Sequence, residues 1–293
     1  MGNSIDYKKM TGHMTLPHTH PRLYLLAFTA FCCLLCACSK NPTSAGGSTI
    51  YKLSYSSPVL YPLGETSETQ VINPNIARTG TYTSFPEGLN MNSTTGAINV
   101  HESETGIKYR VYFTDGSVRD STLIAIGGIN YLDGVYKISS ADSLITPVYN
   151  AEIGSSLPTA GSGSVFDEGG GCNGGGCAVN LNDAKINLAQ TVRNGTFGST
   201  PSNGSSKEFT LNFRINDNSK KGGNKLKVKI FYFKTLSDVT QQVWDLLNGR
   251  NGTVINSFNN SNNTPIQGNT AGNIVTGTST GKGRRPPCVV IIQ

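Results

Sequence analysis

Apolar and polar residues alternate with a period of two through most of the chain after Ile50. The apolar runs are short and are separated by Gly, Asn, Asp and Ser, as expected for antiparallel strands joined by turns. Over 50–127 the runs are Tyr51–Tyr55, Thr81–Phe85, Lys108–Phe113 and Leu123–Ile126. Since no helical periodicity competes with them, we predict a β-sandwich over 50–127.

A second group of alternating runs predicts a second β-rich domain over 128–248. These runs are Tyr131–Ile138, Ala184–Val192, Phe209–Ile215 and Leu226–Phe233. The polar loop Asp217–Asn224 turns the last two runs into one long hairpin. Alternation gives the second strand of this hairpin an apolar side and a lysine side, which we interpret as a core face and a solvated face. The two sides are Leu226, Val228 and Ile230, and Lys225, Lys227 and Lys229.

One segment, 236–248, has helical rather than strand periodicity. Ser237 or Asp238 is a suitable N-cap, and Gly249 ends the helix. Its apolar stripe, which the only tryptophan, Trp244, borders, consists of Val239, Val243, Leu246 and Leu247. We expect this helix to pack its stripe against the sheet of the second domain.

The chain ends with a polar segment and a short apolar run. Residues 249–287 are mostly Asn, Gly, Thr and Ser, a composition that predicts a low-complexity loop. The β-branched run 288–293 predicts a strand. We expect it to close the sheet of the second domain, and the alternative is pairing with the edge of another subunit.

The N-terminal apolar run, Leu23–Leu35, differs from all the others. It is too short to span a bilayer, and Lys8, Lys9 and Arg22 precede it. The run ends in Leu35-Cys36-Ala37-Cys38, which resembles the signal of bacterial lipoproteins. That resemblance implies removal of 1–37 and acyl chains on Cys38, which bind the protein to a membrane. Residues 38–49 then form a flexible tether.

The residue after the lipid-bearing cysteine bears on localisation. By resemblance to known lipoproteins, Ser39 at this position implies sorting to the outer membrane of a Gram-negative cell. The resemblance leaves open which face of that membrane the protein occupies.

A composite motif within 86–113 adds to the fold prediction. Pro86-Glu87-Gly88-Leu89 is followed by Thr95-Gly96-Ala97-Ile98, then by Ser103-Glu104-Thr105-Gly106 and a tyrosine-rich strand. This succession resembles the Ig-like, cadherin-like repeat of bacterial surface proteins. It implies an all-β protein whose first domain is an Ig-like β-sandwich. The acidic clusters with which some relatives bind calcium are missing, so we predict no metal.

Charge and composition narrow the classes of partner. Only 14% of residues are charged, and the formal net charge is +6 without a dense basic patch. The lysines of 225–229 lack the interleaved aromatic residues of a nucleic-acid surface. We therefore predict no nucleic-acid partner, and the composition is typical of an extracytoplasmic β-protein.

Three of the seven cysteines remain once 1–37 and the lipid-bearing residue are set aside: Cys172, Cys177 and Cys288. The glycine-rich stretch Gly169–Cys177 can turn sharply enough to bring two sulfurs together, so we predict a local Cys172–Cys177 disulfide. A bridge from Cys288 to one of them is the alternative. A zinc site needs about four ligands, and only His101 could join the three cysteines. We predict no cofactor.

Hydrolytic catalysis has little support. His101 is the only histidine beyond the predicted cleavage site, and no Gly-x-Ser-x-Gly elbow occurs. Carboxylates pair only as sequence neighbours, Asp167 with Glu168 and Glu102 with Glu104. We therefore predict a protein that is not an enzyme, with no catalytic residues.

The predicted function is non-enzymatic binding or structural display by a lipid-anchored protein of the cell envelope. One alternative is an assembly subunit resembling fimbrillins, which are lipoproteins of two β-sandwiches that exchange a terminal strand between subunits. The other alternative is a carbohydrate-binding accessory lipoprotein. In each case we expect the acyl chains on Cys38 to bind a membrane and the folded part of the protein to bind a protein or glycan ligand.

Overall fold

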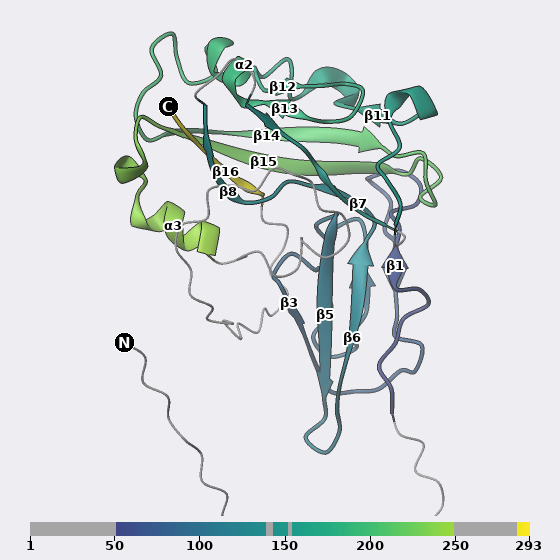
Figure 1. Cartoon of the computed structure of the whole chain (residues 1–293). Helices are drawn as coiled ribbons and strands as arrows, with labels where there is room; N and C mark the ends of the chain where they lie inside the picture. The colour runs from purple at the N-terminus through teal and green to yellow at the C-terminus, as the bar shows by residue number, and fades with distance from the viewer. Residues whose placement is uncertain (1–50, 139–142, 152–153, 249–285) are drawn as a thin grey trace, which may run out of the picture. The chain divides into compact units, whose positions relative to one another are not determined.

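The structure is a computed structural model that describes residues 51–138, 143–151, 154–248 and 286–293 (Figure 1). The predicted signal segment 1–37, Cys38, the tether 38–49 and most of the polar loop 249–287 lie outside the described residues. The described residues all belong to one contact-defined unit, Tyr51–Gln293. The boundary predicted at 127/128 therefore stays a prediction.

The first part of the described chain forms two small sheets. Four strands pair in the order β1-β6-β5-β3, and β2 pairs with β4. β1 runs parallel to β6, and the other pairs are antiparallel. The strands are β1 (Val59–Leu60), β2 (Val71–Ile72), β3 (Thr81–Phe85), β4 (Ile98–Asn99), β5 (Ile107–Thr114) and β6 (Arg119–Ile126).

This strand order is that of an Ig-like sandwich. β3, β5 and β6 correspond to strands C, F and G of one sheet, and β2 and β4 to strands B and E of the other. The predicted all-β, Ig-like fold class is thereby confirmed.

Alternation explains which side chains of the four-stranded sheet are buried. Tyr109, Val111 and Phe113 of β5 point inward, and Tyr82 of β3 meets Phe113 with ring centroids 4.8 Å apart. Tyr51 contacts the same Phe113 ring in a tilted arrangement, with ring centroids 4.7 Å apart. The run Tyr51–Tyr55 alternates between core and surface as expected but forms no strand, and the Leu53 amide instead donates to the Asp120 carboxylate at 2.6 Å.

The composite motif contains a tight turn between Met91 and Ile98. Met91 bridges to Ile98, and Gly96 lies between them at φ +74°, a conformation that favours glycine. A Cβ at Gly96 would lie 2.5 Å from the Tyr82 ring. Glycine is therefore required both by the backbone and by the core.

The second part is built around a five-stranded sheet in the order β11-β14-β15-β16-β8. β14 and β15 form the predicted long antiparallel hairpin, whereas β16 is parallel to both β15 and β8. The C-terminal strand thus lies inside the sheet of its own chain, as favoured from the sequence. The strands are β8 (Gly134–Lys137), β11 (Val165–Phe166), β14 (Ser205–Arg214), β15 (Gly223–Phe233) and β16 (Cys288–Ile292).

Smaller elements complete the second part. β7 (Gly128–Asn130) pairs with β10 (Val148–Asn150), and β12 (Ala178–Val179), β13 (Ile186–Asn187) and β9 (Leu144–Ile145) form a three-stranded sheet. Single 3-10 turns occupy Ala160–Ser162 and Glu168–Gly170.

The predicted strand 184–192 is wrong beyond its first residues. β13 ends at Asn187, and the chain continues as helix α2 (Leu188–Arg193). The Asn187 side chain accepts the Gln190 amide at 2.8 Å, which is an N-cap contact. This local cap starts a helix that apolar alternation alone cannot reveal.

The predicted helix 236–248 is divided in two. A 3-10 turn, Leu236–Asp238, is closed by a capping box between Thr235 and Asp238, and α3 (Gln241–Asn248) follows. The break falls at β-branched Val239, which is extended (φ −64°, ψ 118°). Leu246, placed on the buried stripe from the sequence, is 40% exposed.

The β15–β16 sheet is covered on both faces. One apolar cluster contains Ile230, Val289 and Ile291, and the other contains Phe231, Val290 and Ile292. In Figure 1, α2, β12 and β13 lie over one face, and α3 lies against the other. Val243 and Leu247 of α3 are buried, and Trp244 is partly buried in the second cluster, in agreement with the packing role predicted for the helix.

Candidate functional site

Among the predicted site residues, Cys38 lies outside the described residues, and Cys172 and Cys177 lie together. The Cys177 amide donates to the Cys172 carbonyl at 2.9 Å, and both side chains are fully buried. All three described cysteines are free thiols in the structure. The predicted disulfide therefore stays a prediction.

His101 is a buried histidine in the first part of the chain. Its Nε2 lies 2.7 Å from the Leu63 carbonyl oxygen, and its side chain is almost fully covered. This contact orients the ring toward backbone, whereas a nucleophile-activating histidine contacts a hydroxyl or thiol. The geometry is that of a satisfied core histidine.

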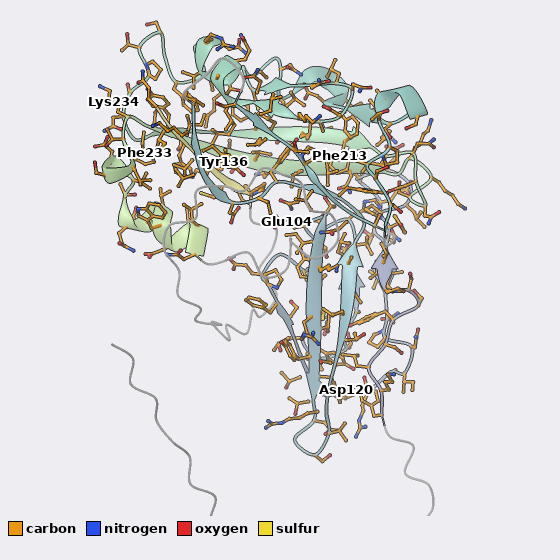
Figure 2. The ribbon with its side chains drawn as sticks, viewed as in Figure 1. Glu104, Asp120, Tyr136, Phe213, Phe233 and Lys234 are labelled. Atoms are coloured by element: carbon orange, nitrogen blue, oxygen red, sulfur yellow. The ribbon has the colours of Figure 1, made fainter. Side chains whose placement is uncertain are left out.

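Glu104 is a buried carboxylate that pairs with amides. Asn130 Nδ2 donates to Glu104 Oε1 at 2.9 Å and to the Thr105 carbonyl at 2.8 Å. The Tyr109 hydroxyl donates to the Glu104 carbonyl at 2.9 Å. Glu102, its neighbour in the predicted carboxylate pair, is exposed (Figure 2 labels Glu104). The structure therefore does not bring these two carboxyl groups together for acid–base chemistry.

The lysine side of β15 is solvated at Lys225 and Lys227, whereas Lys229 is half-buried over the Phe231 ring. Lys225 and Lys227 are exposed while Leu226, Val228 and Ile230 are buried. Lys227 pairs with Glu208 at 2.8 Å, so part of its charge is compensated by the neighbouring strand.

A different surface has the character of a binding site. The outward face, as we call it, consists of the solvent-directed residues of three paired strands of the Ig-like sheet. They are Thr81, Thr83 and Phe85 of β3, Lys108, Arg110, Tyr112 and Thr114 of β5, and Arg119, Ser121 and Leu123 of β6. None of these outward positions carries a carboxylate, and three carry a cation.

The register brings these side chains into rows across the strands. Phe85, Arg110 and Leu123 are direct cross-strand neighbours, and Thr83, Tyr112 and Ser121 form the adjacent row. Tyr112 is 42% exposed and Leu123 is 50% exposed. An aromatic ring, a guanidinium and several hydroxyl groups are thus presented together on a rigid sheet.

The electrostatics at one end of this face are set by the β5–β6 turn. Asp115 accepts the amides of Val118 and Ser117 and pairs with Arg78. These contacts, first the Val118 amide and then the Ser117 hydroxyl, lower the pKa of Asp115 to about 2. The negative charge of Asp115 is therefore stabilised by contacts within the turn and by Arg78.

Sequence reasoning passed over the outward face, although the signal was present. Once Tyr109, Val111 and Phe113 are assigned to the core, alternation places Arg110, Tyr112 and Thr114 on the opposite side.

Two further properties concern the described part of the chain only. No three His, Cys, Asp or Glu side chains gather there as a metal ion would require. None of the helices in these residues is long and apolar enough to cross a bilayer.

No protein-family model matches the chain, and no curated protein matches it either. Among solved structures it is similar to Drosophila N-cadherin EC1-4, with 12% identity and a TM-score of 0.18 over 62% of this chain and 49% of that one. A SusE-like, surface-located polysaccharide-binding protein from the heparin utilisation locus of Bacteroides thetaiotaomicron aligns at 10% identity and a TM-score of 0.21, over 62% and 34% of the two chains.

The four N-terminal Ig domains of Dscam1 isoform 9.44 align at 10% identity and a TM-score of 0.19, over 59% of this chain and 45% of that one. The chain spans about half or less of the length of each of these proteins. Since the scores are low, the Ig-like assignment rests on the strand order and register given above.

Proposed function

We propose that the protein is anchored by acyl chains on Cys38 to the outer membrane and binds an acidic polysaccharide, without catalysis, through the outward face. The observation that carries the binding proposal is the composition of that face: Lys108, Arg110 and Arg119 occur with no carboxylate at any outward position of β3, β5 and β6.

The chemistry of the face favours a charged sugar over an apolar partner. Protein interfaces bury a continuous apolar centre, whereas here Tyr112 and Leu123 are set among threonine, serine and arginine side chains. An exposed aromatic ring can stack on a sugar ring while guanidinium groups donate charge-assisted hydrogen bonds to carboxylate or sulfate. A polysaccharide also matches the extended, flat form of a sheet surface.

Binding is tested with dextran sulfate and neutral dextran, which share a backbone and differ in charge. We expect the purified protein to bind only the sulfated polymer, and Arg110→Ala to weaken binding about tenfold, since a hydrogen bond to a charged group contributes about 1.5–3 kcal/mol. Arg193→Ala, an exposed arginine of α2, is the matched control and is expected to leave binding unchanged. Equal binding of both polymers, or an unaffected Arg110→Ala, would contradict the proposal.

Anchoring is tested separately at the two cysteines of the lipobox. Each buried CH₂ of an acyl chain contributes about 0.8 kcal/mol, so several chains hold a protein on a membrane durably. We expect Cys38→Ser to abolish acylation and release the protein from membranes, while Cys36→Ser leaves both unchanged. An unacylated N-terminus in the native protein would refute the anchor.

A second candidate function, a subunit that assembles by strand exchange, is favoured by one observation. Among the described strands, β16 lies between β15 and β8 and pairs with both, and all five of its residues are buried. The same strand supplied by another copy of the chain would make the same contacts.

Size-exclusion chromatography of the full chain and of a chain ending at Pro287 separates the two functions. An assembly subunit is expected to polymerise only when β16 is present. A monomeric binding protein is expected to be monomeric when intact and to unfold when truncated.

A further inference from the structure

The loop Asp167–Cys177 has a defined fold despite its glycine content. The Asp167 carboxylate accepts the amides of Cys172 at 2.7 Å and of Asn173 at 2.9 Å. The Asn173 side-chain amide donates to Asp167 and to the Val179 carbonyl, at 2.8 and 3.0 Å. Two side chains thus fix the loop at its start and tie it to the strand that follows.

A turn within this loop begins at Cys172 and ends at Cys177, and backbone hydrogen bonds close it. Two amides donate to the Cys172 carbonyl, Gly175 at 3.0 Å and Cys177 at 2.9 Å. Gly176 adopts φ +94°, and a Cβ there would lie 2.5 Å from the Thr196 hydroxyl oxygen. The backbone therefore closes a six-residue turn with the two cysteines at its ends.

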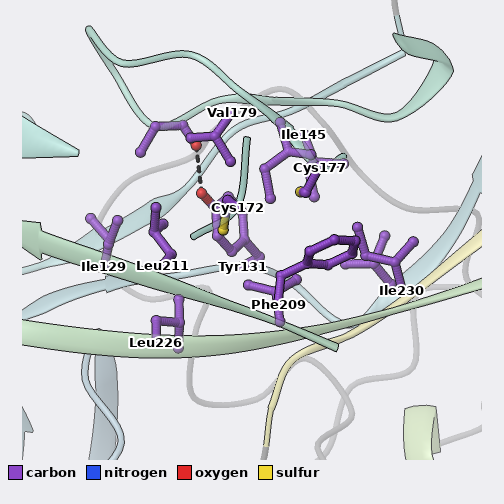
Figure 3. Close-up of a cluster of buried hydrophobic side chains, with 14 of the residues drawn as sticks. Ile129, Tyr131, Ile145, Cys172, Cys177, Val179, Phe209, Leu211, Leu226 and Ile230 are labelled. Carbon is purple, nitrogen blue, oxygen red and sulfur yellow. Dashed lines mark hydrogen bonds between the residues drawn. The ribbon is translucent and has the colours of Figure 1, made fainter. Parts of the chain in front are cut away.

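Both sulfurs lie in the apolar cluster beneath this loop (Figure 3). Tyr131, Phe209 and Ile145 belong to the same cluster, and both cysteines are 0% exposed. The Cys177 side chain nearby, together with burial, raises the pKa of the Cys172 thiol. A thiolate, the nucleophile in disulfide exchange, is thus disfavoured in the packed loop.

Cys288 is separated from this pair by the sheet. β16 alternates, so Val289 and Ile291 face the cluster of Cys172 and Cys177, while Cys288 faces the cluster of Phe231 and Val290. The alternative pairing left open by the sequence, Cys288 with Cys172 or Cys177, would require a side chain to pass through the sheet.

We propose that Cys172 and Cys177 are joined by a disulfide that forms during folding, before the loop packs, and then stays inaccessible to reductants in the native protein. The reaction removes two protons and two electrons from the thiol pair. The electrons pass to the disulfide of an oxidant, either a dithiol oxidase or oxidised glutathione. One thiolate attacks that disulfide, and the second then displaces the oxidant from the mixed disulfide, releasing it as a reduced thiol.

In the cell the inference rests on export to an oxidising compartment, which is part of the proposed function. Refolding in glutathione tests the pairing independently of export. Lys137 and Lys185 flank both cysteines in one tryptic peptide, 138–185, so the disulfide shows as two missing alkyl labels and the loss of two hydrogen masses.

The protein is denatured, refolded with oxidised and reduced glutathione, then denatured again and alkylated without reductant. We expect peptide 138–185 to be unlabelled and Cys288 to be fully labelled as the internal control. The Cys172→Ser and Cys177→Ser variants are each expected to take one label in that peptide. Without denaturation, dithiothreitol is expected to leave the wild-type peptide oxidised.

Two outcomes would overturn the inference: two labels on peptide 138–185 after glutathione refolding, or a cross-linked peptide containing Cys288. A protein that is reduced when isolated from cells but oxidises during refolding would support the pairing and count against the proposed localisation instead.

Discussion

β5 of the first sheet and β16 of the second are both inner strands, but they differ in composition and in their surroundings. In β5 buried residues alternate with accessible ones, whereas all five residues of β16 are buried. β5 lies between antiparallel neighbours, and β16 lies between parallel ones. Antiparallel sheets can leave one face in water, while parallel strands are covered on both faces.

This difference suggests a division of roles between the two sheets. Where β16 pairs with β15, the second sheet packs both faces against apolar clusters, one under α2, β12 and β13 and the other under α3. The first sheet packs its inner face and presents Arg110, Tyr112 and Leu123 on the other. A sheet with both faces packed serves as a scaffold, and a sheet with one accessible face offers a surface for recognition.

The largest effect on stability is expected from a substitution in the core around the parallel strand β16. Ile291→Ala deletes a fully buried side chain and should lower the free energy of unfolding by about 2–5 kcal/mol. Ile76, which is 52% exposed, provides the matched control, and Ile76→Ala should change stability by less than about 0.5 kcal/mol. Urea unfolding measures both, and equal effects would show that β16 is not a central strand.

A smaller effect on stability is expected from substitutions on the inner and outer faces of β5. Tyr109→Phe leaves the buried Glu104 carbonyl without its hydroxyl donor and should cost about 1–3 kcal/mol. Tyr112→Phe, three residues along on the outward face, should cost less than about 0.5 kcal/mol. The same unfolding experiment distinguishes them, and the reverse order would invert the assignment of inner and outer faces.

The smallest stability effect concerns pH and the β5–β6 turn. The pKa of Asp115 is lowered to about 2, below the value of about 3.9 for an unfolded chain. Its contribution is therefore complete above about pH 5 and is lost as the pH falls through about 2. Asp115→Asn should be less stable than wild type at neutral pH, and the gap should close between about pH 5 and pH 1. A gap that stays constant with pH would show that ionisation of Asp115 does not matter.

The strands of the first sheet were predictable because apolar alternation and turn residues are local signals. Thr81–Phe85 was predicted with its observed bounds, and Lys108–Phe113 and Leu123–Ile126 fall within β5 and β6. A short turn joins β5 to β6, whereas the pairs β3–β5 and β1–β6 join strands that are distant in sequence.

The strand order of the second sheet was less predictable because one of its inner strands, β16, comes from the end of the chain. That 288–293 is a strand followed from its β-branched residues, but its position between β15 and β8 depends on contacts remote in sequence. The helix α2 was missed because one side-chain contact, Asn187 to the Gln190 amide, outweighs the alternation of the following residues.

The two candidate sites also show that sequence patterns reveal local features better than features built from several strands. The cysteine pair was found because glycine spacing is a local signal, and the structure adds the separation from Cys288. The outward face was missed because it becomes visible only when residues from β3, β5 and β6 are placed in register. Arg110 and Tyr112 do not indicate a binding surface within their own strand. They do so only together with their neighbours on β3 and β6.

The most direct test of the account reverses one charge on each sheet and measures binding to dextran sulfate. Arg110→Glu on the outward face and Lys225→Glu on β15 change the net charge equally, so general electrostatics affects both alike. The account predicts that Arg110→Glu weakens binding at least about tenfold and Lys225→Glu less than about threefold. An equal loss in the two variants, or no loss in Arg110→Glu, would contradict the claim that the Ig-like sheet carries the binding surface.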